Sequence, residues 1–279
     1  MRELHISEVR AIQLAALSCL HDFCFENDLE YFLCAGSLLG AIRHDGYIPW
    51  DDDIDVVMPR KDYMRFISLT RTGLGRFVVR SPYHDDSNGG SVYLYNHCKI
   101  VDPRTLLIES PSTRRVESSV FLDIFPSDGL PANARMVSLV YRGARFLILA
   151  NAAIDASSFR RRSARSVASW VLWSSIALLG AVLPKKFFFR RLDQFAMRRD
   201  FDSADNVGLV VGGYGEKECM PREIFEGHLL HAFEGGEFRI PVGYDAYLKR
   251  LYGDYMQLPP EGERRGHDQV VFLRDDRHL

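Results

Sequence analysis

Apolar and polar positions in the first part of the chain predict a helix, a strand and a second helix. Over residues 7–27 apolar side chains recur every three or four positions, which predicts a helix with one buried face and Ser7 as its N-cap. Residues 31–35 form an apolar run without helical periodicity, so we expect a buried strand. It ends at a Gly36-Ser37 turn, and a short helix over residues 38–43 follows.

Further along the chain the same reasoning predicts more strands and helices. In chain order these are a strand over 50–58 ended by Pro59, a helix over 61–70, a β-rich segment over 91–101, a strand over 120–125 ended by Pro126, a β segment over 233–241 and a helix over 244–252. The sequence has no internal repeat and no low-complexity tract. We therefore expect a globular protein that mixes helices and strands.

Composition narrows the function classes. With 35 basic and 37 acidic side chains in 279 residues, the formal net charge is -2, which argues against nucleic-acid binding through bulk positive charge. The five cysteines are widely spread and contain no Cys-x-x-Cys pair, so we expect neither a disulfide framework nor a zinc site. This pattern favours a reducing compartment. The N-terminus lacks the basic-then-apolar layout of a secretory signal, which favours the cytoplasmic side of the membrane.

The charge is distributed unevenly along the chain. Residues 131–200 contain 13 Arg and Lys against 3 Asp, which gives about +10 for this segment and about -12 for the rest. Within it, residues 166–183 carry no charge and have basic residues on both sides. We expect a helix lying in the interface of an anionic membrane, with a buried core helix as an open alternative. The predicted domains are a catalytic core over 1–130, a largely helical basic insertion over 131–205 and a C-terminal part over 206–279.

An acidic run carries the first candidate chemistry. In the strand predicted over residues 50–58, Asp51, Asp53 and Asp55 point to one face, because side chains alternate along a strand. Carboxylates crowded in this way are stabilised by a divalent cation, and oxygen ligands suit Mg²⁺ or Mn²⁺. The alternative is a solvated acidic loop. The apolar continuation of the run into residues 56–58 favours the metal site.

Two further features belong with the acidic run. Gly36 and Ser37 precede a predicted helix, whose N-terminus can receive a phosphate. Asp123 lies in the middle of an apolar strand, where an unpaired carboxylate costs several kcal/mol. It is a candidate for a further metal ligand or for a general base, and the alternative is a structural ion pair.

Four segments resemble the LicD family, the phosphotransferases that include the fukutin-like proteins. They are residues 35–63, which read AGSLLGAIRHDGYIPWDDDIDVVMPRKDY, residues 99–109, residues 121–131, and residues 251–260 followed by Arg264, Arg265 and His267. The resemblance covers both ends of the chain and leaves the basic middle segment outside. It implies an α+β fold of the nucleotidyltransferase type, a mixed sheet flanked by helices.

The resemblance also implies roles for individual residues. Asp53 and Asp55, with Asp51 alongside, would hold the metal, and Gly36 and Ser37 would hold the donor phosphates. Arg43, His44 and Lys99 would be the positive groups near the transferring phosphate, and Arg264, Arg265 and His267 would close the site from the C-terminal side. Independently of the resemblance, the aromatic ring of Trp50 could stack on a pyrimidine base or face a choline ammonium, with core packing as the alternative.

The implied reaction moves a phosphorylated small group from a CDP-linked donor to a glycan, a lipid-linked glycan or a teichoic-acid-like polymer. The runner-up is a glycosyltransferase that uses Asp-x-Asp with a nucleotide sugar, and a third hypothesis is a membrane-bound scaffold without activity. The sequence leaves open whether choline, ethanolamine, ribitol or glycerol phosphate is transferred. We expect a peripheral protein at the inner face of the cell membrane.

Overall fold

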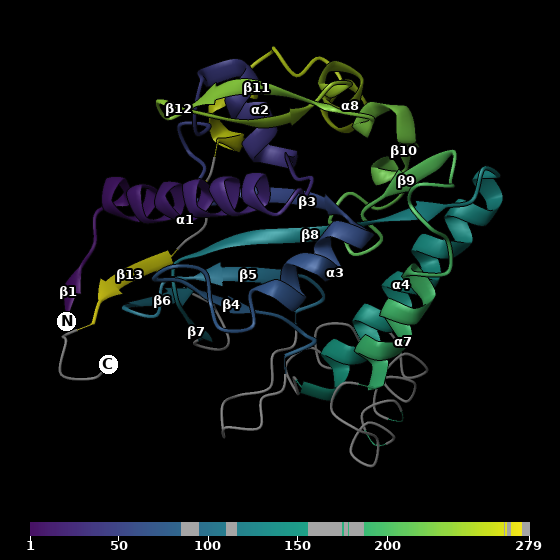
Figure 1. Cartoon of the computed structure of the whole chain (residues 1–279), viewed down its shortest axis with the longest axis horizontal. Coiled ribbons are helices and arrows are strands. Elements are labelled where there is room, and N and C mark those ends of the chain that lie inside the picture. Colours follow the sequence, from purple (N-terminus) through teal and green to yellow (C-terminus); the bar gives the residue numbers. More distant parts are fainter. Residues whose placement is uncertain are drawn as a thin grey trace.

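The structure is a computed structural model that describes residues 1–84, 95–109, 116–155, 175, 178, 187–264, 266 and 269–274. It has an α+β fold, as predicted, with helices packed around a mixed central sheet (Figure 1). The main path of this sheet runs through β10 (Met220–Pro221), β9 (Asn206–Gly208), β8 (Phe121–Leu130), β3 (Asp55–Pro59) and β2 (Phe32–Leu33). A branch adds β5 (Cys98–Val101) and β4 (Val78–Arg80), with β5 paired to β8.

Strand β8 is the centre of the sheet. One edge pairs in parallel with β3, from Asp55–Asp123 onward, and the other edge pairs first with β5 and then with β9. The prediction that Pro126 ends this strand is wrong. The Asp123 N–H donates to the carbonyl of Ile54, directly before β3, so alternation directs the backbone nitrogen of position 126 toward the opposite edge. There the proline lies between the β5 and β9 pairings, where no ladder hydrogen bond is lost.

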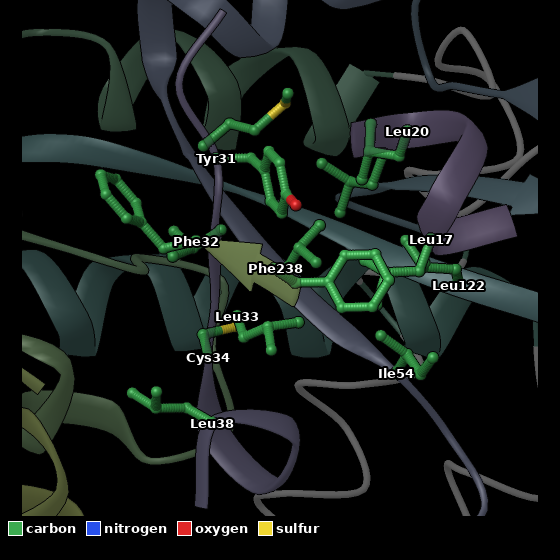
Figure 2. Packing of buried hydrophobic residues seen from close by; sticks show 14 of the residues in the cluster. Leu17, Leu20, Tyr31, Phe32, Leu33, Cys34, Leu38, Ile54, Leu122 and Phe238 are labelled. Atoms are coloured by element: carbon green, nitrogen blue, oxygen red, sulfur yellow. The ribbon is translucent and has the colours of Figure 1, made fainter. Parts of the chain in front are cut away.

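Two helices cover one face of the sheet. Helix α1 (Ile6–Glu26) and helix α3 (Arg60–Leu69) meet through the rings of Phe23 and Phe66, whose centroids are 5.8 Å apart. Figure 2 shows Leu17 and Leu20 of α1 directed toward the side chains of the sheet. Both leucines are fully buried, and each such side chain contributes about 1.5–3 kcal/mol to the hydrophobic stabilisation.

Helix α1 is confirmed, but its N-cap is not the predicted one. His5 caps the helix because its Nδ1 accepts the Ser7 N–H at 3.3 Å, while the Glu8 side chain accepts the His5 N–H at 3.0 Å. This reciprocal pair is a capping box with histidine in the place usually taken by serine or threonine.

The C-terminal part adds a hairpin and a helix beside α2 (Ala35–His44). The hairpin consists of β11 (His228–Phe233) and β12 (Gly236–Pro241), and α8 spans Tyr244–Tyr252 as predicted. Figure 1 shows this group above one end of α1. Three short 3-10 helices lie at Gly215–Glu218, Arg222–Phe225 and Glu261–Glu263. A separate sheet joins β1 (Arg2–Glu3), β13 (Gln269–Leu273), β6 (Thr105–Glu109) and β7 (Val116–Ser118).

The described part of the basic segment is helical, as predicted. Helix α4 (Ala134–Asp155) packs along α7 (Phe187–Ala196) at one end of the molecule (Figure 1). Arg60 attaches α7 to the sheet, because its guanidinium lies 2.7 Å from Asp128 of β8 and 3.0 Å from Asp193 of α7. The three side chains are largely buried. Removing one charged partner from such a buried group of ion pairs lowers the stability of the fold.

Some sequence expectations fall outside the described residues. These are the start of the predicted β segment, residues 91–94, and nearly all of the uncharged stretch 166–183, of which only Ser175 and Leu178 are described. Among the described helices, none has the length and apolar character needed to cross a bilayer. All five cysteines are free, in agreement with the prediction that no disulfide framework exists.

Candidate active site

Three charged residues lie in one row across the central sheet. The register pairs Asp55 of β3 with Asp123 of β8, and Asp123 with Lys99 of β5. The three side chains therefore share the face opposite to the one covered by α1 and α3. Lys99 Nζ lies 2.7 Å from Asp123 Oδ1, and His97 Nε2 lies 3.2 Å from the same oxygen. The two acidic strands are thus direct neighbours in the sheet, with a lysine and a histidine beside Asp123.

The two carboxylates of the row have opposite electrostatic environments. Burial raises the pKa of Asp55 well above its usual value, and the nearby charges of Asp53 and Asp123 raise it further. Burial also acts to raise the pKa of Asp123, but His97 and Lys99 outweigh it and the pKa is lowered. Asp123 is therefore held as a carboxylate, with the Lys99 ammonium and the His97 ring beside it.

The acidic run itself is not a strand. Strand β3 begins only at Asp55, and residues 51–54 have no regular secondary structure. The prediction of a strand from residue 50 is wrong in this part. Even so, ligand oxygens of Asp51, Asp52 and Asp53 all lie within 4.8 Å of one another. The cluster includes Asp52, which alternation along a strand had placed on the other face.

Side chains from distant segments hold the acidic run in place. Arg10 Nη2 donates to the Asp51 carbonyl oxygen and, at 3.1 Å, to the carbonyl of Pro49. Gln13 Nε2 donates to the Asp52 carbonyl at 2.8 Å, and Gln269 Nε2 donates to Asp52 Oδ2 at 2.6 Å. These bonds replace the strand ladder expected there. Sequence reasoning missed all three donors, because a side chain that bonds a remote backbone leaves no periodic signal.

The start of α2 also bonds the acidic residues. The helix begins at Ala35, so Gly36 and Ser37 lie in its first turn rather than before it. A Cβ at Gly36 would lie only 2.7 Å from Asp51 Oδ2, so glycine permits this close approach. Ser37 Oγ accepts the Asp55 N–H at 2.8 Å. Their binding of donor phosphates stays a prediction.

Basic residues gather near Trp50, which precedes the acidic run in the chain. At the end of α2, Arg43 Nε donates to His44 Nε2 at 2.9 Å, and Arg43 Nη1 donates to the Tyr255 carbonyl at 2.8 Å. Burial and the neighbouring Arg264 lower the pKa of Arg43. The Arg264 guanidinium lies 5.4 Å from the ring centroid of Trp50. Two arginines held this close to each other form a favourable position for an anionic group.

The other predicted basic residues have different outcomes. Burial and Arg43 together lower the pKa of His44, which favours the neutral imidazole. Arg265 and His267 lie outside the described residues, and their roles stay predictions. A cavity of about 460 Å³ opens beside Arg43 and Trp50, which is within the range of small-molecule sites.

The donor set fits a hard divalent cation. All candidate ligands are carboxylate oxygens. The pKa of Asp55 is raised first by burial and then by the neighbouring carboxylates, and a cation would relieve their repulsion. The predicted set Asp51, Asp53, Asp55 and Asp123 differs from the observed cluster, since Asp123 already contacts Lys99 and His97. The Lys99 contact is the ion pair of the structural interpretation of Asp123. The pairing of Asp123 with Asp55 in the sheet supports its interpretation as a metal ligand.

Comparison with known proteins finds a relative that matches nearly the whole chain. The chain is 32% identical to the lipopolysaccharide cholinephosphotransferase LicD of Haemophilus influenzae, over 96% of this chain and 97% of that protein. The chain belongs to the LicD family. A family model described as "LicD/FKTN/FKRP, nucleotidyltransferase domain" matches residues 28–109, which contain Gly36, the acidic run and Lys99. The predicted resemblance is confirmed, and with it an enzyme of the transferase class.

Shorter similarities concern proteins of unknown role. An uncharacterised protein of Rickettsia typhi is 37% identical over 67 residues, which is 24% of this chain and 22% of that protein. An uncharacterised protein of Rickettsia prowazekii is 36% identical over 63 residues, or 22% of this chain and 24% of that protein. The assignment to the LicD family therefore rests on the full-length relative.

Proposed function

We propose that the protein transfers phosphocholine from CDP-choline to a cell-surface glycan in a reaction that depends on Mg²⁺ or Mn²⁺. The strongest support is the row Asp55–Asp123–Lys99 next to the acidic run, in a chain that aligns over 96% of its length with a cholinephosphotransferase. The relative is a lipopolysaccharide cholinephosphotransferase, and choline and lipopolysaccharide enter the proposal from it. A lipopolysaccharide or teichoic-acid-like glycan, free or lipid-linked, is the proposed acceptor.

The residues of the site suit phosphoryl transfer, which depends on positioning and charge neutralisation more than on covalent help from the protein. A bound divalent cation on Asp51, Asp53 and Asp55 would offset the charge of the donor diphosphate. Arg43 and Arg264 are neighbours, and both lie near Trp50, the residue that precedes the acidic run. They can hold phosphate oxygens of the donor.

The remaining charged residues position the acceptor side. Asp123 stays ionised beside Lys99 and His97, so its carboxylate can accept a hydrogen bond from the attacking hydroxyl. Lys99 Nζ also lies 3.4 Å from the ring centroid of Phe121, which fixes the ammonium against the floor of the site. Lys99 can then stabilise charge that develops on the transferring phosphate.

The test is an assay of CMP release with purified protein, Mg²⁺, an acceptor glycan and a panel of CDP-linked donors. The proposal predicts CMP release that is fastest with CDP-choline, and loss of release when EDTA removes the metal. Release of a nucleoside diphosphate from a nucleotide sugar, with none from any CDP-linked donor, would refute it and favour a glycosyltransferase.

We also place the protein at an anionic membrane surface, where lipid-linked acceptors reside. The support lies on α4, where Met136, Leu139 and Phe146 are exposed and Arg142 and Arg145 lie on the same helix. Exposed apolar side chains among arginines favour binding to anionic lipid. Co-sedimentation with vesicles of phosphatidylglycerol and phosphatidylcholine tests this part. Binding at low salt that Leu139→Ser with Phe146→Ser reduces supports it, and absence of binding at low salt refutes it.

A further inference from the structure

The cavity beside the acidic run has a lining of unusual chemistry. Three aromatic side chains, Trp50, Tyr252 and Tyr255, line it together with Asp254 and Glu263. Arg43, at the end of α2, also contributes to the lining. One cationic and two anionic side chains thus border a cavity of about 460 Å³, and apart from Gln257 the rest of its lining is aromatic and aliphatic.

The tyrosines offer the cavity their rings rather than free hydroxyl groups. The Tyr252 hydroxyl is bonded to the Tyr214 hydroxyl at 2.8 Å, and the Tyr255 hydroxyl donates to Asp245 Oδ1 at 3.0 Å. A polyol such as ribitol or glycerol needs several hydrogen-bond partners. Ring surfaces instead suit methyl groups that carry a diffuse positive charge.

The charges of the lining match a zwitterion. Asp254 and Glu263 belong to the segment that follows α8 and are exposed at the cavity. Arg43 comes from α2 and has Arg264 as a neighbour. A phosphate on the arginine side and a quaternary ammonium against the rings and carboxylates would satisfy both signs, whereas a neutral nucleoside would use neither carboxylate charge.

We infer that this cavity binds the trimethylammonium end of the donor, with Trp50, Tyr252 and Tyr255 as its aromatic wall and Asp254 and Glu263 as its anionic rim. The inference rests on the proposed function and adds the position of the choline group to it. Trp50 directly precedes Asp51 in the chain, so the cavity adjoins the carboxylates that act on the diphosphate. The relevant ligand class is a phosphate ester of a quaternary amino alcohol.

The test compares phosphocholine with 3,3-dimethylbutyl phosphate, which has the same shape but carbon in place of the charged nitrogen. Titration calorimetry at low salt is suitable, because the exposed carboxylates are screened by ions. We expect the wild-type protein to bind phosphocholine roughly tenfold more tightly than the neutral analogue. In the double variant Asp254→Asn with Glu263→Gln this preference falls to about twofold or less, while the affinity for CMP stays the same.

A matched control lies in the same short helix. Glu261 is exposed and belongs to the Glu261–Glu263 turn, but it does not line the cavity, so Glu261→Gln should retain the preference for phosphocholine. Thermal unfolding followed by circular dichroism checks that the double variant is folded.

Two results would overturn the inference. One is equal affinity of the wild-type protein for phosphocholine and its neutral analogue, including no detectable binding of either. The other is a double variant that weakens CMP binding as much as phosphocholine binding, since this would place the nucleoside in the cavity. Release of CMP from CDP-choline is measured in parallel. If CMP is released but the protein does not prefer phosphocholine over its neutral analogue, the proposed function stands and the cavity assignment fails. If the protein prefers phosphocholine but releases no CMP, the cavity assignment stands and the proposed function fails.

Discussion

Replacing Glu218 by Gln should remove a large pH dependence from the stability of the protein. Glu218 has an exposed fraction of 3%, and its Oε2 makes no hydrogen bond to any described group. The Tyr214 N–H bonds the carboxyl group, and a Cβ at Gly212 would lie 2.6 Å from Oε1. Burial raises the pKa of Glu218 to about 7 from a usual value of 4.5, against the smaller opposing effect of this hydrogen bond.

The sign and size of the effect follow from proton linkage. Below pH 4.5 both the folded and unfolded states carry the proton, so Glu218 contributes no penalty. Between pH 4.5 and about 7 only the unfolded state releases it, so the free energy of unfolding falls as pH rises. At 1.36 kcal/mol for each unit of pKa difference, the loss amounts to about 3 kcal/mol above pH 7.

Urea unfolding at pH 4.5, 5.5, 6.5 and 8, followed by circular dichroism, measures this loss. The stability of Glu218→Gln minus that of the wild type should increase by about 3 kcal/mol across the series. Glu237 lies exposed on β12, so Glu237→Gln serves as the control and should show no such increase. A difference for Glu218→Gln that stays constant with pH would refute the reasoning, because it would mean that Glu218 titrates alike in both states.

Other substitutions test the contacts that build the site. Gln13→Leu removes the amide that donates to the Asp52 carbonyl. We expect the free energy of unfolding, measured with urea, to fall by about 1–3 kcal/mol and Mg²⁺ to bind more weakly in calorimetry. Unchanged Mg²⁺ affinity would contradict the positioning role of Gln13. Lys99→Met leaves Asp123 buried without its ammonium and should lower the free energy of unfolding by about 3–5 kcal/mol. Adding Asp123→Leu should restore much of this loss. Losses that simply add in the double variant would contradict the coupling of the two charges. Arg60→Met leaves Asp128 and Asp193 without the guanidinium that joins them, so we expect a loss of about 3 kcal/mol or more and faster proteolysis within α7 than within α1. Equal rates of proteolysis would contradict its attachment role.

The sequence predicts the strands of the site because their signals are local. Apolar residues around Asp55 and Asp123 mark two buried strands, and the structure pairs these residues directly in the sheet. The position of Lys99 opposite Asp123 depends on the antiparallel register of β5. No local pattern specifies that register, so only the family resemblance indicated Lys99.

The conformation of the acidic run could not be predicted from the pattern of the chain. Alternation along a strand groups Asp51 with Asp53 and separates Asp52, but the backbone there is bonded by Arg10 and Gln13 of α1. These tertiary hydrogen bonds override the local preference for a strand and bring the three carboxylates together.

The most direct test of the account is CMP release from CDP-choline in the presence of Mg²⁺ and an acceptor glycan, measured for the wild type and for Asp53→Asn. The control Asp22→Asn changes an exposed residue of α1. We predict CMP release by the wild type and by Asp22→Asn, and a loss of at least a hundredfold in Asp53→Asn, since a missing electrostatic contact at the reacting phosphate costs roughly this much. Equal rates for Asp53→Asn and the wild type would contradict the claim that the acidic run acts on the donor diphosphate.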